Sequence, residues 1–329
     1  TEKKEKEIKI LTKNKEIQTL ELSRQKLFRN LFIIGFAFIL ILAFVIYNRY
    51  RLKTKAHKEL TKAHNQLNEA KEVIEEKNDH IMSSIRYAQK IQQAILPVHE
   101  KMKEALTDYF VIFKPQAIVS GDFYWFSQIK DKMLVAVVDC TGHGVPGAFM
   151  SMIGNSLLNK IVNENKIFDP AVIMERLHNG VRAALKQEGE DVETQDGMDV
   201  CLCVLETKKK KITFTGARRP LYHIHNSELV EIKGDRKSIG GLQKEEKRTF
   251  TKNEIEVNPG DMIYMITDGF ADQSNAQEKK YGSRRLKEYL QKNTKLGSSE
   301  QKEALLAELK THQGDEVQRD DITVLGIKM

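Results

Sequence analysis

The sequence is poor in cysteine, and its larger part has no surplus of positive charge. Only Cys140, Cys201 and Cys203 occur among 329 residues, which argues against a disulfide framework and fits a reducing compartment for the C-terminal part. Residues 1–96 carry 19 basic and 11 acidic side chains out of 53 and 46 in the chain, so residues 97–329 carry 34 and 35. The larger part therefore lacks the positive bias of a nucleic-acid-binding domain, and we expect no nucleic-acid partner.

Charge is also missing from one long stretch near the N-terminus. The segment LFIIGFAFILILAFVIY, Leu31 to Tyr47, is 17 residues without a charged side chain, and Leu27 and Phe28 extend it. A bilayer core needs about 20 apolar residues, with a lower limit near 17. The small-residue cleavage site of a signal peptide does not follow it. We therefore expect residues 27–48 to form a transmembrane helix.

Basic residues flank this segment unequally. Six lie within residues 49–62, against three within residues 24–29 on the other side. Positive charge collects on the cytoplasmic side of membrane helices, which predicts a single-pass protein of the inner (cytoplasmic) membrane whose C-terminal part is cytoplasmic. Residues 1–26 are expected to form a polar helix at the end of an upstream domain.

A heptad pattern follows the apolar stretch. Apolar side chains recur every seven residues from Leu60 to Ile95, over about five heptads without Gly or Pro. This strict period favours a parallel coiled coil over a single amphipathic helix packed on its own domain. We expect residues 49–96 to form a juxtamembrane signalling helix that joins two chains as a homodimer through residues 60–96.

From residue 97 onward the sequence is typical of short strands separated by turns, with several helices. Strands are predicted at 123–129, 133–139, 200–206, 211–217, 221–226, 261–268 and 322–329. Helices are predicted at 145–164, 170–187, 283–292 and 299–311. The strands do not alternate regularly with helices, which favours an antiparallel α+β domain.

Aspartates stand at the ends of many of these strands. They are Asp122, Asp139, Asp196, Asp199, Asp268, Asp320 and Asp321. A carboxylate that ends a buried strand is costly unless it is solvated, caps a turn or binds a cation. A single such Asp is more typical of a turn. Because Asp196 and Asp199 precede one strand, and Asp320 and Asp321 another, the seven aspartates mark five strand ends. Five such strand ends in one domain indicate a shared role. Oxygen ligands without His or Cys partners suit Mg²⁺ or Mn²⁺ better than Zn²⁺.

The stretch VVDCTGHGVPGAF, residues 137–149, allows two other chemistries. A cysteine phosphatase needs an Arg in the short loop after its nucleophile, and none follows Cys140. A Walker-type loop needs Lys and then Ser or Thr after its glycines, and Ala148 and Phe149 stand there instead. A metal-binding Asp139 is therefore the favoured interpretation.

Seven segments of the C-terminal part carry a family resemblance. They are SGDFYW, DCTGHGVPGAFMS, GARRPLYHI, DRKSIGG, GDMIYMITDGFAD, KYGSRRL and RDDITVLGI. In order and spacing they resemble the signature segments of the SpoIIE-type branch of the metal-dependent protein phosphatases, the PPM family. For residues 97–329 the resemblance implies an α-β-β-α sandwich of two antiparallel sheets with a metal centre at one edge.

The resemblance also implies which residues bind two metal ions. Asp139 resembles the carboxylate that bridges them, and the backbone carbonyl of Cys140 resembles a ligand of the second ion. Asp268 and Asp320 resemble ligands of the first ion, with Asp321 as the alternative in the doublet. Two such ions about 3.5–4 Å apart lower the pKa of a shared water and hold the phosphoryl oxygens, so no covalent nucleophile is needed.

Further residues are assigned by the same resemblance. Asp122 looks like the acidic residue that meets the metals through a bound water. Asp199 is similar in position to a ligand of a third, weaker ion, with Asp196 as its competitor. His143 is either the proton donor to the leaving serine or a turn residue near the site. Eukaryotic members grip phosphate with an Arg upstream of the first Asp, where this sequence has only Lys114 nearby.

The function expected from the sequence is therefore that of a membrane-anchored, metal-dependent serine/threonine phosphatase. The resemblance implies that it removes phosphate from a regulatory protein, commonly an anti-sigma-factor antagonist, with Mn²⁺ or Mg²⁺ as the cofactor. The alternative is a catalytically inactive, membrane-tethered scaffold that binds a phosphorylated partner.

Overall fold

The computed structural model describes residues 2–106, 108–187, 194–243 and 245–329. The chain divides into two compact units, residues 1–80 and 81–329. The first unit belongs to helix α1 (Glu2–Ile95), whose last turns are part of the second unit. An 18-residue window of α1 has a mean hydropathy of 2.6 and none of it is buried, so its length and composition suit a membrane span.

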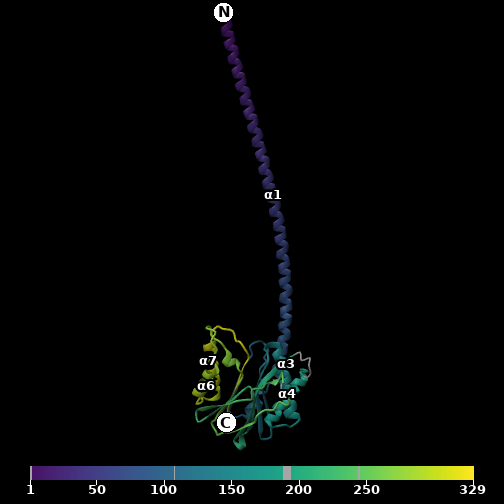
Figure 1. The fold of residues 1–329 in the computed structure, drawn as a ribbon, viewed down its shortest axis with the longest axis vertical. Coiled ribbons are helices and arrows are strands. Elements are labelled where there is room, and N and C mark those ends of the chain that lie inside the picture. Colours follow the sequence, from purple (N-terminus) through teal and green to yellow (C-terminus); the bar gives the residue numbers. More distant parts are fainter. Residues whose placement is uncertain (1, 107, 188–193, 244) are drawn as a thin grey trace. The chain divides into compact units, whose positions relative to one another are not determined.

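Two antiparallel sheets form the centre of the second unit (Figure 1). Sheet A consists, in spatial order, of β1 (Asp108–Lys114), β11 (Ile322–Lys328), β10 (Met262–Ile266), β6 (Leu221–His225) and β7 (Glu228–Ile232). Sheet B consists of β2 (Phe123–Ile129), β3 (Lys132–Cys140), β4 (Gly197–Glu206), β5 (Lys211–Ala217) and β9 (Asn253–Glu256), with β8 (Ile239–Gly240) paired to β4.

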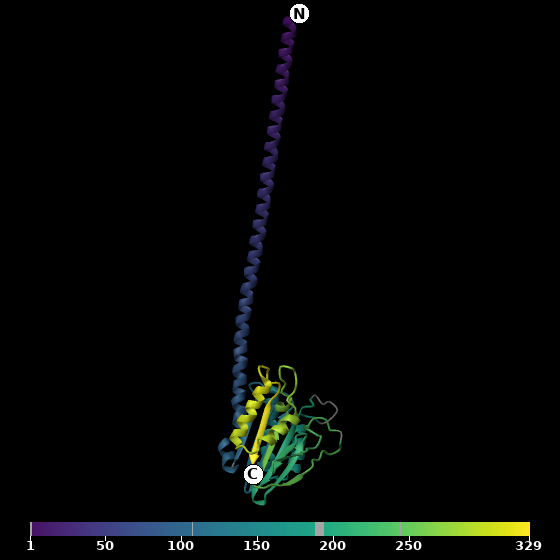
Figure 2. The same cartoon turned by 90° about the vertical axis from the view of Figure 1, so that its left-hand side faces the viewer.

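Helices cover the outer face of each sheet. Sheet B is covered by α3 (Gly144–Leu158), the π-helix η1 (Asn159–Glu164) and α4 (Pro170–Ala184), and sheet A by α6 (Ser283–Lys292) and α7 (Ser298–Gln313). In Figure 2 the yellow helix α7 lies in front of sheet A. The short helices are α2 (His99–Ala105), η2 (Thr207–Lys209) and α5 (Gly269–Asp272). This arrangement confirms the predicted α-β-β-α sandwich.

Strand β3 shows how the sequence builds these layers. Successive side chains of a strand point to opposite faces. Val135 and Val137 belong to the core between the two sheets, whereas Leu134, Ala136 and Val138 belong to the core under α3 and α4. Because both faces of β3 are buried, its middle contains only apolar residues.

Some elements differ from the sequence prediction. The helix expected over residues 145–164 is α-helical only to Leu158 and then continues as the π-helix η1. Strands β1, β7 and β9 were not predicted. Edge strands β7 and β9 are only five and four residues long and have no fully buried residue, so their local apolar signal is weak.

Candidate active site

Sheet B brings three of the predicted aspartates to one of its edges. Strand β3 ends where β4 begins, and Asp139 pairs directly with Asp199 across these two strands. Asp122 precedes β2, whose first residue, Phe123, pairs with Val138 near the end of β3. The antiparallel register therefore places all three carboxylates at the same edge of sheet B.

Sheet A contributes the remaining acids at its adjoining edge. Asp268 follows β10, and Asp320 and Asp321 precede its neighbour β11. The hydroxyl of Thr267 donates a hydrogen bond of 2.7 Å to Asp122 Oδ2, which joins the end of β10 to the start of β2. The candidate site thus lies where the edges of the two sheets meet.

A guanidinium group holds three of these carboxylates together. Arg219, which lies just after β5, places Nη2 at 2.6 Å from Asp268 Oδ2, 3.1 Å from Asp139 Oδ2 and 3.3 Å from Asp199 Oδ2. The other oxygen of Asp199 accepts a 2.7 Å hydrogen bond from the hydroxyl of Ser238. One side-chain cation therefore joins carboxylates from both sheets.

The doublet before β11 divides into two structural roles. Asp321 is buried, and its two carboxylate oxygens accept hydrogen bonds of 2.7 Å from the backbone N–H groups of Gln116 and Gly121. Asp320 is partly exposed, and its Oδ1 accepts the backbone N–H of Asp321 at 2.8 Å. Asp321 thus holds the loop before Asp122, whereas Asp320 keeps its second oxygen without a hydrogen bond among the described residues.

Close backbone contact fixes Asp122 beside the end of β3. A Cβ atom added to Gly121 would lie 2.3 Å from the carbonyl oxygen of Gly142, and one added to Gly147 would meet the same oxygen at 2.3 Å. Real side chains cannot approach that closely, so only glycine fits at either position. The loop before β2 and the start of α3 are therefore packed backbone to backbone.

Burial and mutual repulsion shift the protonation of the central acids. Burial raises the pKa of Asp139 to about 9, with a further contribution from the charge of Asp122 and an opposing one from Arg219. Burial also raises the pKa of Asp122 to about 8, although its hydrogen bond from Thr267 favours the charged form. Carboxylates crowded in this way are stabilised as anions by added positive charge.

Cys140 and His143 occupy different environments. Cys140 is buried, and burial raises the pKa of its thiol well above the usual range, so the thiol is not an activated nucleophile. His143 is exposed at the start of α3, and its side chain does not cap that helix. It stands three residues after the end of β3, the strand that carries Asp139.

The donors at this edge fit hard divalent cations. They are carboxylates and the backbone carbonyl of Cys140, which lies close to Gly121. Oxygen ligands of this kind suit Mg²⁺ or Mn²⁺. Within the described ranges, no three His, Cys, Asp or Glu side chains form a complete ion-binding cluster. Arg219 instead contacts the carboxylates, which demonstrates that they attract a cation.

Asp196 and Lys114, two further predicted candidates, lie outside the contacts of this cluster. Asp196 precedes β4 and its backbone carbonyl accepts a hydrogen bond from Gln187, whereas its carboxylate makes no hydrogen bond or ion pair with the described residues of the site. Lys114 ends β1, and its carbonyl accepts a hydrogen bond from Gln318. Among the described side chains, Arg219 rather than Lys114 is the cation within the carboxylate cluster.

Two residues of the site were not found from the sequence. Arg219 stands in GARRPLYHI, and the only signal for it was a basic pair directly after a strand. Gln92, in the last turn of α1, is 3% exposed and had no sequence signal. Its amide donates to Ser120 O at 2.6 Å and to Ser151 Oγ at 2.9 Å, and it accepts the N–H of Ser120 at 3.0 Å. Helix α1 thus holds the backbone two residues before Asp122.

Comparisons with known proteins agree with this geometry. A family model described as stage II sporulation protein E (SpoIIE) matches residues 129–329. The chain is similar to the phosphoserine phosphatase RsbU of Bacillus subtilis, with 24% identity over 196 residues, 58% of this chain and 54% of that protein. It is also similar to protein IcfG of Synechocystis sp., with 24% identity over 242 residues, 66% of this chain and 37% of that protein.

Among solved structures, the SiaA-PP2C domain of Pseudomonas aeruginosa is similar to this chain. The two are 33% identical with a TM-score of 0.69, and the match covers 77% of this chain and 98% of that domain. The chain spans 54% of the length of RsbU and 37% of the length of IcfG.

Proposed function

Because the chain belongs to the SpoIIE family of PP2C-type serine/threonine phosphatases, we propose that its second unit removes phosphate from a phosphoserine or phosphothreonine of a regulatory protein in bacterial signalling. The observation that carries this proposal is the convergence of Asp139 and Asp199 from sheet B with Asp268 from sheet A on one cationic group. Such a convergence supports a reaction in which cations neutralise phosphoryl charge.

The carboxylates take separate roles in this proposal. Asp139, Asp268 and Asp320 hold Mn²⁺ or Mg²⁺ together with the carbonyl of Cys140, and Asp199 serves a third, weaker ion. When bound, such ions supply an activated water and a clamp on the phosphoryl oxygens. Asp122 is kept in place beside them by its hydrogen bond from Thr267.

His143 is the proposed proton donor to the departing serine oxygen. Its imidazole is exposed at the N-cap of α3, three residues after the end of β3, which carries Asp139, and this supports the role. Histidine is the most common general acid in enzymes, so it is suited to give a proton to an alkoxide leaving group. Cys140 takes no part through its thiol.

Hydrolysis and ion binding test the activity together. The full chain in detergent should hydrolyse p-nitrophenyl phosphate and a phosphoserine peptide in the presence of Mn²⁺, and Asp139→Asn and Asp268→Asn should each abolish turnover. Calorimetric titration should show that the same variants bind Mn²⁺ more weakly. Asp315→Asn, which alters an exposed acid after α7, is the matched control. Phosphopeptide binding without turnover by the unaltered chain would instead support the inactive scaffold.

We also propose that α1 anchors the chain in the cytoplasmic membrane and joins two copies through residues 60–96. The apolar window of α1 supports the first point, and the exposed side chains of Leu60, Leu67 and Ile74 support the second. Residues 97–329 alone should be less active than a fragment that keeps residues 60–96, because Gln92 is lost. Equal rates would contradict the role of Gln92, and a monomeric longer fragment in analytical ultracentrifugation would contradict the dimer.

A further inference from the structure

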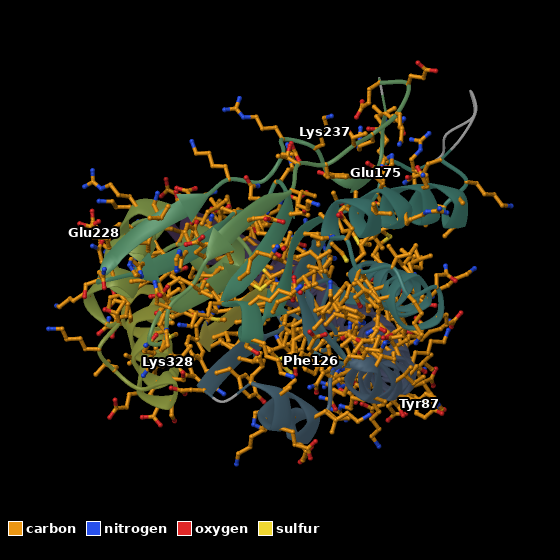
Figure 3. The ribbon with its side chains drawn as sticks, turned by 90° about the horizontal axis from the view of Figure 1, so that it is seen from below. Tyr87, Phe126, Glu175, Glu228, Lys237 and Lys328 are labelled. Atoms are coloured by element: carbon orange, nitrogen blue, oxygen red, sulfur yellow. The ribbon has the colours of Figure 1, made fainter. Side chains whose placement is uncertain are left out.

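A basic pocket lies beside the candidate active site. It has a volume of about 510 Å³, and its lining includes Arg218, Arg236, Lys237, Ser238 and Arg248. Ser238 connects the pocket to the site, because its hydroxyl hydrogen bonds to Asp199 at 2.7 Å. Figure 3 shows Lys237 at the edge of the domain, on the opposite side of the view from Lys328.

Two of these cations are not neutralised. Arg218 and Arg236 are exposed, and neither has an ion pair with any described residue. Asp235, which precedes Arg236 in the chain, accepts hydrogen bonds from Thr251 with both carboxylate oxygens, from the N–H at 2.6 Å and from the hydroxyl at 3.0 Å. Asp235 is therefore engaged with Thr251, and both arginines are available to a ligand.

The backbone presents the two arginines together. Ala217 and Asp235 form a parallel bridge, in which Arg218 N–H donates to Asp235 O at 2.7 Å and Asp235 N–H donates to Gly216 O at 2.8 Å. A Cβ on Gly216 would lie 2.9 Å from the Cα of Gly234, so the two segments are in close contact. Arg218 and Arg236 each follow one residue of this bridge and are therefore neighbours on a fixed support.

The other two cations of the pocket, Arg248 and Lys237, contact residues of the pocket loop itself. Arg248 donates to Glu245 Oε1 at 2.7 Å, to Ser238 O at 2.8 Å and to Leu242 O at 2.7 Å, which ties the loop together. Lys237 lies 4.0 Å from Glu245. With four cations and one acid named in its lining, the pocket carries three net positive charges.

We propose that this pocket binds an acidic segment of the phosphorylated protein substrate, next to the phosphoserine that enters the carboxylate site. The inference rests on the proposed phosphatase function and adds a substrate class to it. Charge complementarity favours an acidic peptide, and the described residues of the pocket lining include no aromatic side chain on which nucleic-acid bases would stack. Because Ser238 contacts both the pocket and Asp199, a bound acidic segment lies close to the reacting phosphate.

Two synthetic phosphoserine peptides of equal length test this inference on the full chain in detergent with Mn²⁺. One peptide has Glu at alternate positions on both sides of the phosphoserine, and the other has Gln at those positions. We expect kcat/KM to be about tenfold higher for the Glu peptide, mainly through a lower KM, because two exposed ion pairs contribute modestly each. The preference should shrink when salt is raised from about 50 mM to about 500 mM.

Charge reversal identifies the residues responsible. Arg218→Glu combined with Arg236→Glu should bring the ratio of the two kcat/KM values to about one or below, and the two Arg→Gln changes should lower it partway. Lys295→Glu combined with Lys310→Glu makes the same charge change at exposed positions after α6 and on α7, and should keep the ratio. A ratio near one in the unaltered chain, or one that the Arg variants leave intact, would overturn the inference.

A binding measurement separates this inference from the phosphatase proposal. If neither peptide nor p-nitrophenyl phosphate is hydrolysed, the phosphatase proposal fails, and fluorescence anisotropy of a labelled, unphosphorylated Glu peptide then tests the pocket by itself. Binding that is lost in the Arg218→Glu and Arg236→Glu variant supports the pocket, whereas absence of binding rejects it. Tighter binding of a single-stranded oligothymidine that the same variant abolishes would reject the acidic-peptide assignment.

Discussion

Replacement of Arg219 by Met removes the cation that contacts three carboxylates of the site, while it keeps most of the side-chain volume. Two unit charges 4 Å apart interact by about 1 kcal/mol in water and by about 4 kcal/mol at an effective dielectric constant of about 20. The pKa of Asp139 is about 9, so its carboxyl is mostly neutral at pH 7, and we count only the contacts with Asp199 and Asp268. The Asp268 side chain is 43% exposed, so we use the lower value for each contact. The sum is about 2 kcal/mol, before subtraction of the entropy that ordering the Arg side chain costs.

A divalent ion must compete with this guanidinium for the same oxygens. Every 1.4 kcal/mol corresponds to about a factor of ten in affinity, so Arg219→Met should bind Mn²⁺ about 10- to 100-fold more tightly. All three contacts come from Nη2, and Nε is buried without a hydrogen-bond partner among the described residues, so the guanidinium is incompletely satisfied where it lies. This arrangement favours release of Arg219 when an ion binds.

Isothermal titration of the metal-free full chain with Mn²⁺ measures the effect. Arg219→Lys keeps one positive charge and should give an intermediate affinity, while Arg218→Met changes the exposed neighbour and should match the unaltered chain. The thermal midpoint of metal-free Arg219→Met should also fall, because its carboxylates then face one another without a counter-charge. Unchanged or weaker Mn²⁺ binding by Arg219→Met would refute the competition.

Three other changes give separate tests. Gln92→Ala removes the amide that holds Ser120, and we expect kcat to fall about tenfold because Asp122 is less well positioned. Gln92→Glu should not restore kcat. Full activity of both variants would contradict the positioning role of Gln92. Cys140→Ala should keep kcat within about threefold, since no thiolate attacks the substrate, whereas loss of several orders of magnitude would indicate a covalent nucleophile. His178 is buried, and burial lowers its pKa below the usual 6.5, so it is neutral in the folded chain. The unfolded chain then binds more protons in acid, and the free energy of unfolding should decrease as pH falls through about 6.5, by at most about 1.4 kcal/mol per unit. Chemical denaturation at several pH values should show a flatter profile for His178→Gln, and an equally steep profile would exclude His178 as the cause.

Much of the fold was predictable because its strands have both local pattern and burial. The central segments of β3 and β4 are continuous apolar runs bounded by Asp and turn residues, so their positions follow from the sequence alone. Strand β9, of sequence NEIE, pairs with β5 from a distance of about forty residues, and nothing local in four residues specifies that pairing. The elements that were missed are those whose pairing depends on the assembled sheet.

The acids of the candidate site were predictable from the sequence, but their separate contacts were not. Strand-end aspartates reveal which acids lie near the edge, because antiparallel neighbours alternate their ends. The different roles of Asp320 and Asp321 depend on the path of the loop at Gln116 and Gly121, which no local pattern reports. The contacts of Arg219 likewise exist only after β5 has taken its place beside β4.

The candidate site is shared between the two sheets, and this has a consequence for folding. In the proposed site neither sheet alone supplies all the carboxylates, so an ion would find its full set only when the sheets have docked. A ligand that binds only the folded state stabilises it by RT ln(1 + [L]/Kd). Micromolar changes in free Mn²⁺ should therefore shift the melting of both layers together, and chelation should loosen the sandwich as a whole. A bound ion would cross-link two sheets that the hydrogen bonds from Gly121 N–H to Asp321 and from the Thr267 hydroxyl to Asp122 already join.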